Sequence, residues 1–156
     1  MNKAGMIGVS IWALVISISV DAQETQKTQD YKMGIGIRFS SRAPVVNNSV
    51  SFKYFIKDQV AVETLLSFGD PLALGLLVEK HKPFAGTSFN YFYGGGMYVG
   101  FSRPAMAGLQ GVVGLDYKIP GLPVNLSLDW KPELNFTNEF FFEPAALGLS
   151  ARFTLN

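Results

Sequence analysis

The chain has 156 residues, of which 48% are hydrophobic and only 16% are charged, and its net charge is +1. This length suits one domain, and charged residues are scarcer than the roughly 25% of an average soluble domain. The near-neutral charge argues against nucleic acid as a partner. The chain has no cysteine and a single histidine. This excludes disulfides, thiol catalysis and Cys- or His-rich metal sites, so we expect no cofactor and no metal.

Residues 1–22 have the features of a secretory signal peptide. Lys3 provides a positive start, a long apolar run follows, and the small residue Ala22 ends the segment. We therefore expect cleavage after Ala22. The alternative is an uncleaved anchor, for which the apolar run is at the short limit. The polar residues 23–30 are expected to form a flexible lead-in, and residues 31–156 the folded domain.

From residue 31 onward, apolar and polar side chains alternate in segments of about ten residues that turn residues separate. Such alternation is typical of β-strands, and no stretch has a sustained helical period. The segments, in chain order, are 31–40, 49–57, 60–68, 72–81, 89–101, 109–119, 123–134 and 145–155. The sequence therefore predicts an all-β domain with an even number of strands and no helix to cover a sheet.

The seventh segment raises the question of which face of the strands is inside. It places Asn125, Ser127, Asp129, Lys131 and Glu133 at every second position. A soluble sandwich or lipocalin-like barrel would turn such faces to water. However, the polar faces also carry many glycines, which weaken an exposed strand but make room for large side chains inside a narrow barrel. A membrane barrel has apolar residues outside and polar residues inside, with strands of about 9–11 residues. The sequence therefore favours an eight-stranded antiparallel up-and-down transmembrane β-barrel.

The positions of the outward aromatic residues support this orientation. If the amino terminus lies on the periplasmic side, these residues fall near both ends of the strands, as the two interfaces of a bilayer select. The two expected belts contain Tyr31, Phe39, Phe68, Tyr91, Phe101, Tyr117, Trp130 and Phe153. Lys80 is the clear charge on the lipid-facing side, near the periplasmic rim, where a lysine can snorkel.

The inward positions are expected to hold a closed network of paired charges. An eight-stranded barrel is only just wide enough for its own side chains, and buried charges persist only when they are paired. The expected network comprises Arg38, Lys53, Glu63, Glu79, Asp116, Asp129, Lys131 and Arg152, and Lys57, Lys118 and Glu133 complete an inward set of six cations and five anions. Within this set, Arg152 is expected to pair with Glu63, Glu79 or Asp116.

Three functions remain open for such a barrel. A structural or interaction role fits a closed interior best. A narrow pore, or a carrier of small hydrophobic molecules, would use a shallow cavity between Phe92 and Tyr98. A lipid-modifying enzyme is the third, but His81 is expected at a periplasmic turn and no second histidine could act as a base. We therefore expect no catalytic residue. In the last outer loop, Phe140 to Phe142 form either an adhesive tip or an anchor at the lipid interface, and the anchor is favoured.

The chain contains EKH at residues 79–81, YFYGGGMYVGF at 91–101 and GLDYKIPGLPVNLSLDWKPELNF at 114–136. These segments resemble a group of short envelope barrels, and the whole mature chain is similar in build to the OmpA membrane domain and OmpX of Gram-negative bacteria. The resemblance implies an outer-membrane location, contact with outer-membrane lipid, and transient handling by periplasmic chaperones and the barrel assembly machinery. It implies no enzyme activity, and we expect a monomer. Such barrels usually end in an aromatic residue, whereas here three residues follow Phe153.

Overall fold

The computed structural model describes residues 30–137 and 139–156. The expected signal peptide, its cleavage site and residues 23–29 of the lead-in lie outside this part of the chain. Ten strands and no helix are present in the described residues. None of these residues forms a helix that could cross a membrane.

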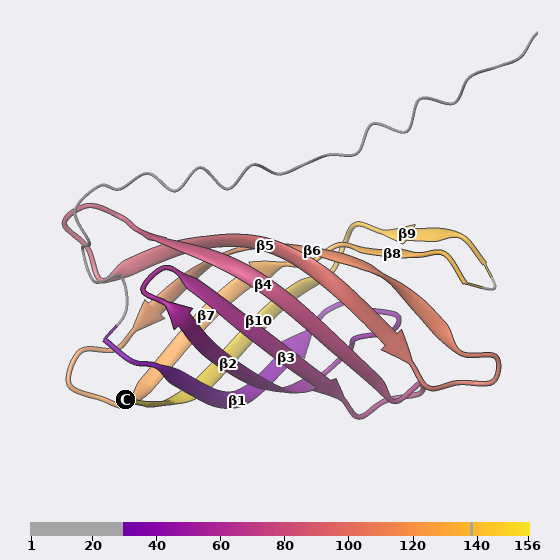
Figure 1. The fold of residues 1–156 in the computed structure, drawn as a ribbon, viewed down its shortest axis with the longest axis horizontal. Helices are drawn as coiled ribbons and strands as arrows, with labels where there is room; N and C mark the ends of the chain where they lie inside the picture. The colour runs from indigo at the N-terminus through magenta and orange to yellow at the C-terminus, as the bar shows by residue number, and fades with distance from the viewer. Residues whose placement is uncertain (1–29, 138) are drawn as a thin grey trace, which may run out of the picture.

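The strands form one antiparallel sheet that closes on itself (Figure 1). They are β1 (Met33–Ser40), β2 (Ser49–Lys57), β3 (Val60–Ser67), β4 (Ala73–Pro83), β5 (Phe89–Gly100), β6 (Met106–Lys118), β7 (Val124–Trp130), β8 (Glu133–Asn135), β9 (Phe141–Glu143) and β10 (Leu147–Leu155). Neighbours pair in the order β5-β4-β3-β2-β1-β10-β7-β6, and β6 pairs with β5 again. This closes the ring, which leaves no free edge in the body of the barrel. The fold is therefore all-β, an eight-stranded antiparallel closed barrel, and the expected fold class is confirmed to that extent.

β7 and β8 are two parts of one wall strand that Pro132 interrupts. Both pair with β6 in one continuous register. On the other side β7 pairs with β10 and β8 pairs with β9, and between these pairings Lys131 and Pro132 face the longer stretch 144–146. Proline cannot donate a ladder hydrogen bond, so the pairing slips at this point. The β8–β9 hairpin then continues beyond the ring (Figure 1).

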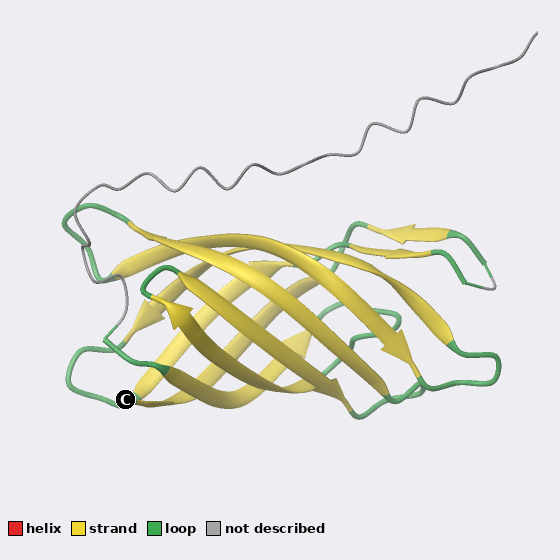
Figure 2. Ribbon diagram, viewed as in Figure 1, coloured by secondary structure: helices red, strands yellow, loops and turns green. Residues whose placement is uncertain are grey.

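The two ends of the barrel differ in their connections, which Figure 2 shows in green. One end, which we call the turn end, carries residues 30–32, the turns 58–59, 84–88 and 119–123, and the C-terminal Asn156. The other, which we call the loop end, carries the connections 41–48, 68–72 and 101–105, and residues 136–137 and 139–140.

Side chains alternate between a buried inward face and an exposed outward face. In β10, Arg152 is 2% exposed whereas its neighbour Phe153 is 51% exposed. The outward face is mostly apolar, and the inward face carries most of the buried polar and charged residues. The polar residues of the seventh segment, Asn125 to Glu133, all lie on the inward face. The barrel therefore has the inverse polarity of a soluble core.

The two closest seams of the ring depend on glycine, and a third, along β6, does so at Gly108 and Gly114. A Cβ on Gly36 of β1 would lie 1.9 Å from the carbonyl oxygen of Ala151 in β10. A Cβ on Gly96 of β5 would lie 1.8 Å from the carbonyl oxygen of Leu76 in β4. No side chain fits at such distances, so the strands approach this closely only because both positions lack one. The β1–β10 and β4–β5 seams lie opposite one another in the ring.

Candidate functional site: the charged interior

The interior contains two clusters of paired charges. The turn-end cluster comprises Lys53, Glu63, Glu79, His81, Asp116 and Arg152. The loop-end cluster comprises Arg38, Asp129, Lys131 and Glu133. All ten side chains are buried. They come from seven wall strands, where β7 and β8 count as one and Lys131 lies in the break between them.

Arg152 crosses the lumen from β10 to Glu63 on β3. Its guanidinium donates to the Glu63 carboxylate, to the hydroxyls of Ser51 (2.6 Å) and Ser127, and to the amide oxygen of Asn125 (3.4 Å). The Ser51 hydroxyl in turn donates to Glu63 at 2.5 Å. Glu63 is one of the three carboxylates expected as the partner of Arg152. The uncharged partners, which sequence reasoning did not single out, satisfy the remaining donors of the guanidinium.

A chain of contacts links Lys53 to Asp116 across the same layer. The Lys53 amine lies 2.7 Å from Glu79 and 3.7 Å from Glu63. The Glu79 oxygen that faces Lys53 is also 3.0 Å from Nε2 of His81, whose Nδ1 lies 3.7 Å from Asp116. Both ring nitrogens of His81 therefore face carboxylates.

The structure corrects the position expected for His81. This residue lies within β4, which continues to Pro83, and it is 0% exposed. Its ring stacks on Phe92 at 5.0 Å and meets the edge of Phe55 at 4.9 Å. The flanking lysines are part of the strand and face outward, so they do not mark a turn.

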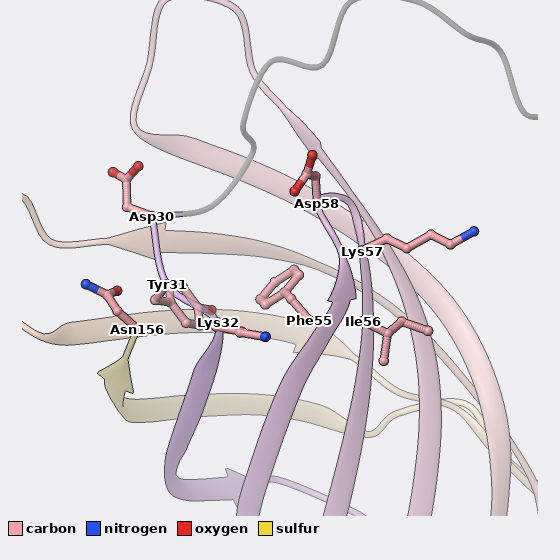
Figure 3. A pocket seen from close by; sticks show the side chains of 8 residues that line it. All are labelled: Asp30, Tyr31, Lys32, Phe55, Ile56, Lys57, Asp58 and Asn156. Carbon is pink, nitrogen blue, oxygen red and sulfur yellow. The ribbon is translucent and has the colours of Figure 1, made fainter.

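Tyr31 is also corrected, because it was expected in an outward aromatic belt. It precedes β1, turns inward and is 5% exposed. Its hydroxyl donates to Asp116 at 3.5 Å, and its ring meets Phe55 edge-on at 5.4 Å. Burial, together with the nearby Asp116 carboxylate, raises the pKa of Tyr31 well above its usual value, so the hydroxyl keeps its proton. Figure 3 shows Tyr31 and Phe55 in the wall of a hollow of about 450 Å³ at the turn end.

The other seven residues of the two expected belts lie on the outward face. They are Phe39, Phe68, Tyr91, Phe101, Tyr117, Trp130 and Phe153. Tyr91 and Tyr117 are half-buried because Phe84 and Phe89 pack against them. In the last loop, Phe140 is 76% exposed and Phe142 is 56% exposed, whereas Phe141 packs against the apolar core. These three rings therefore do not share one surface.

The loop-end cluster consists of two pairs. The Arg38 guanidinium donates two hydrogen bonds to the Asp129 carboxylate, from Nε to Oδ2 at 3.1 Å and from Nη2 to Oδ1 at 2.5 Å. The Lys131 amine lies 2.7 Å from one oxygen of Glu133. The other oxygen of Glu133 accepts the backbone N–H of Val45 at 3.3 Å, which ties connection 41–48 to the lumen.

Connection 41–48 folds back into the loop end of the barrel. Val45 and Val46 are 1% and 0% exposed. They belong to an apolar cluster whose wall residues are Leu65, Ala73, Leu77, Phe92, Tyr98 and Val112. Phe92 and Tyr98 are themselves buried, so the shallow cavity expected between them is filled. Val45 and Val46 fill this space. The sequence did not indicate that their side chains point inward, because a connection has no alternating pattern.

The charge balance of the interior also differs from the expected one. Lys57 is exposed, because the register shifts between Phe55 and Lys57 and places Lys57 opposite the outward Val60. Lys118 lies at the turn end, where its amine donates to the carbonyl oxygens of the 119–123 turn. The buried interior therefore holds four basic side chains and five carboxylates, namely Arg38, Lys53, Lys131 and Arg152 against Glu63, Glu79, Asp116, Asp129 and Glu133. The buried carboxylates therefore outnumber the buried lysines and arginines by one.

Fold and interior together define a class: a closed eight-stranded barrel with an apolar outer wall and a lumen filled by ion pairs. No family model, curated protein or solved structure matches the chain. Within the described residues, no group of three or more His, Asp or Glu side chains is arranged to hold a metal ion. The arrangement of the interior is suited to holding the strands of the ring together.

Proposed function

We propose that this protein is an integral barrel of a bacterial outer membrane, similar in build to the OmpA membrane domain and OmpX, with a structural or interaction role. The observation that carries the proposal is the polarity of the wall. Leucine, isoleucine, valine and phenylalanine side chains cover the outward face, while the charged side chains are buried in the lumen. Soluble monomers rarely expose contiguous apolar patches above a few hundred Å², whereas this arrangement is the one that hydrocarbon requires.

A closed lumen is part of the proposal. The turn-end cluster joins β2, β3, β4, β6 and β10 through contacts of two cations and His81 with three carboxylates. Val45 and Val46 fill the loop end. These contacts favour a barrel that its own side chains fill over a narrow pore or a carrier. Steady channel openings in a planar bilayer at neutral pH would contradict the closed lumen.

We propose no chemistry at His81. Its side chain is enclosed by two aromatic rings and two carboxylates. The hydroxyl of Ser51 bonds to Glu63 and Arg152, and that of Tyr31 bonds to Asp116. A nucleophile needs a base within hydrogen-bond reach and access to substrate. The partners proposed for the chain are therefore outer-membrane lipid and, during biogenesis, periplasmic chaperones and the barrel assembly machinery. The protein is proposed to be a monomer, exported by cleavage after Ala22.

The experiment that tests the membrane proposal is a charge placed on the wall. Leu128 lies in the middle of β7, faces outward and is 54% exposed. In a bilayer, Leu128→Lys should cost about 2–4 kcal/mol of folding free energy, as measured for lysine near the midplane of membrane barrels. In water the same exposed substitution should stay within about 0.5 kcal/mol. Asn47→Lys, at an exposed position of the loop end, is the matched control.

The measurement is urea unfolding in lipid vesicles, with heat-dependent migration on a detergent gel as the check of folding. A selective loss of stability for Leu128→Lys supports the proposal. A wild-type chain that stays folded and monodisperse in plain buffer, together with a neutral Leu128→Lys, would overturn it.

A further inference from the structure

The outward wall carries lysines at one end. No carboxylate occupies an outward position in strands β1 to β7 or β10. Four lysines do project outward, and all lie at the turn end: Lys32, Lys57, Lys80 and Lys82. We call these four residues the lysine rim.

Each lysine reaches this surface for an identifiable reason. Lys80 and Lys82 follow the outward alternation of β4. Lys57 is turned outward by the register shift in β2, and Figure 3 shows its side chain extending away from that of Phe55. Lys32 lies beside β2, where its amine stands 5.6 Å from the ring centre of the outward Tyr54.

Tyrosines accompany the lysine rim. Tyr93 is the cross-strand neighbour of Lys80, and Tyr91 is that of Lys82. Tyrosine and lysine are both amphipathic, with an apolar body and a polar tip. In membrane proteins both place that tip at the boundary between hydrocarbon and water. The rim therefore lies where the apolar wall ends.

The ammonium groups of the lysine rim are not neutralised by the barrel. Within residues 30–137 and 139–156, no ion pair joins any of the four to a carboxylate. Asp30 and Asp58 are the nearby acids, and Figure 3 shows the Asp58 carboxylate pointing away from the Lys57 amine. The rim thus presents unpaired positive charge next to an apolar surface.

We propose that the lysine rim binds the phosphate groups of lipid headgroups in the leaflet at the turn end. This inference rests on the proposed function, since the wall must be embedded for the rim to meet headgroups. Anionic lipid attracts basic residues near the membrane surface, and a phosphate next to acyl chains matches an ammonium on an apolar stem. The loop end differs, because its exposed cations Arg42 and Arg103 lie in connections and not on the wall. The rim would therefore also fix which end of the barrel faces which leaflet.

The test measures the lipid shell of the reconstituted barrel by electron spin resonance. Wild-type protein is placed in phosphatidylcholine vesicles that contain a trace of spin-labelled phosphatidylglycerol or spin-labelled phosphatidylcholine. The motionally restricted fraction of each label gives its relative association with the barrel surface. We expect phosphatidylglycerol to be preferred by about twofold or more at low salt, and the preference to fall in high salt.

The variant Lys32→Gln/Lys57→Gln/Lys80→Gln/Lys82→Gln should lose the preference, so that the two labels associate equally. Replacing the same four lysines by arginine should keep it. The matched control, Arg42→Gln/Arg103→Gln, removes exposed cations from the loop end and should behave as wild type. If the fourfold glutamine variant does not fold, Lys32→Gln/Lys57→Gln, which leaves β4 unchanged, should lose a measurable part of the preference.

Equal association of both labels with the wild-type barrel would overturn the lysine rim while leaving the embedded wall intact. An equal loss in the arginine-to-glutamine control would overturn it as well, because the effect would then be one of net charge. A wild-type sample that restricts neither label would overturn the embedding itself, and with it the rim. The failure of the inference and the failure of the proposed function therefore give different spectra.

Discussion

The pair between Arg38 and Asp129 allows the clearest test of how the interior holds the barrel together. We predict that Arg38→Gln destabilises the folded barrel by about 3–5 kcal/mol, the range for removing one partner of a buried ion pair. Two features of the pair put the expected loss of stability in that range. Both side chains are almost fully buried, at 1% and 4% exposed, and two hydrogen bonds join them. Within the described residues, Asp129 forms no other ion pair, so its carboxylate would stay buried without an ion-pair partner.

The double variant Arg38→Gln/Asp129→Asn separates the interaction from the loss of side-chain volume. An amide pair of similar shape carries no charge and can still form a hydrogen bond, so the double variant should be more stable than Arg38→Gln alone. Contacting residues show coupling energies of about 0.5–3 kcal/mol in such cycles, and a buried, doubly bonded pair should lie at the upper end. Arg42→Gln, at an exposed position, is the control and should stay within about 0.5 kcal/mol of wild type.

The assay is equilibrium unfolding in urea in lipid vesicles, followed by the fluorescence of Trp130, which lies on the outward face directly after Asp129. Two results would refute the reasoning. One is an Arg38→Gln variant within about 1 kcal/mol of wild type, which would mean that water solvates the carboxylate. The other is a double variant whose loss equals the sum of the two single losses, which would mean that the pair is not coupled.

Other predictions concern the same interior. Gly148→Ala should reduce the unfolding free energy about as much as Arg38→Gln, since the added Cβ would lie 2.2 Å from Nη2 of Arg38. In the Arg38→Gln background the same substitution should cost little. Equal losses of stability in both backgrounds would contradict the contact. Val46→Asp should expel connection 41–48 from the lumen, because an unpaired buried carboxylate is costly. Trypsin should then cut in this connection about tenfold faster or more, whereas Asn47→Asp, the control, should not change the rate. Unchanged cleavage of Val46→Asp would argue against the plug. Glu133→Gln should cost about 3 kcal/mol of unfolding free energy, because it leaves Lys131 without a carboxylate. Glu79→Gln should cost clearly less, because carboxylates outnumber cations in the buried interior. Equal unfolding free energies of the two variants would show that the charge count does not govern stability.

The faces of the strands were predictable because alternation is a local property. Side chains at positions i and i+2 share a face of a strand, so the direction of Asp129 and Lys131 followed from the sequence once one face was assigned to the inside. A charged residue on that face also had to find a partner, which restricted the choice for Arg152 to a few carboxylates. Which one it reaches depends on the order of the strands around the ring and on their stagger, and no local pattern contains this information.

Two of the corrected positions lie where alternation stops or is shifted. Tyr31 precedes its strand, and Lys57 follows a shift in register, so extrapolating the pattern assigned each to the wrong face. His81 was placed in a turn because two charged neighbours suggested one, although the period of two continued through them. Val45 and Val46 were missed as a plug because a connection has no period. The available signal was a pair of adjacent valines in an otherwise polar connection. Two apolar side chains side by side are unfavourable in water, so the pair indicates that other residues cover it.

The bare backbone at the two glycine seams has a consequence for the shape of the lumen. A ring that bent equally at every junction would enclose a round bore. The closest approaches, at Gly36 and Gly96, lie on opposite sides of the ring, and Gly108 and Gly114 allow less close ones along β6. We therefore expect an oblong cross-section that bends most at the first two seams. The short dimension of such a slot is what a single arginine can span. On this view, the absence of a few methyl groups determines how long the ion-pairing side chains need to be.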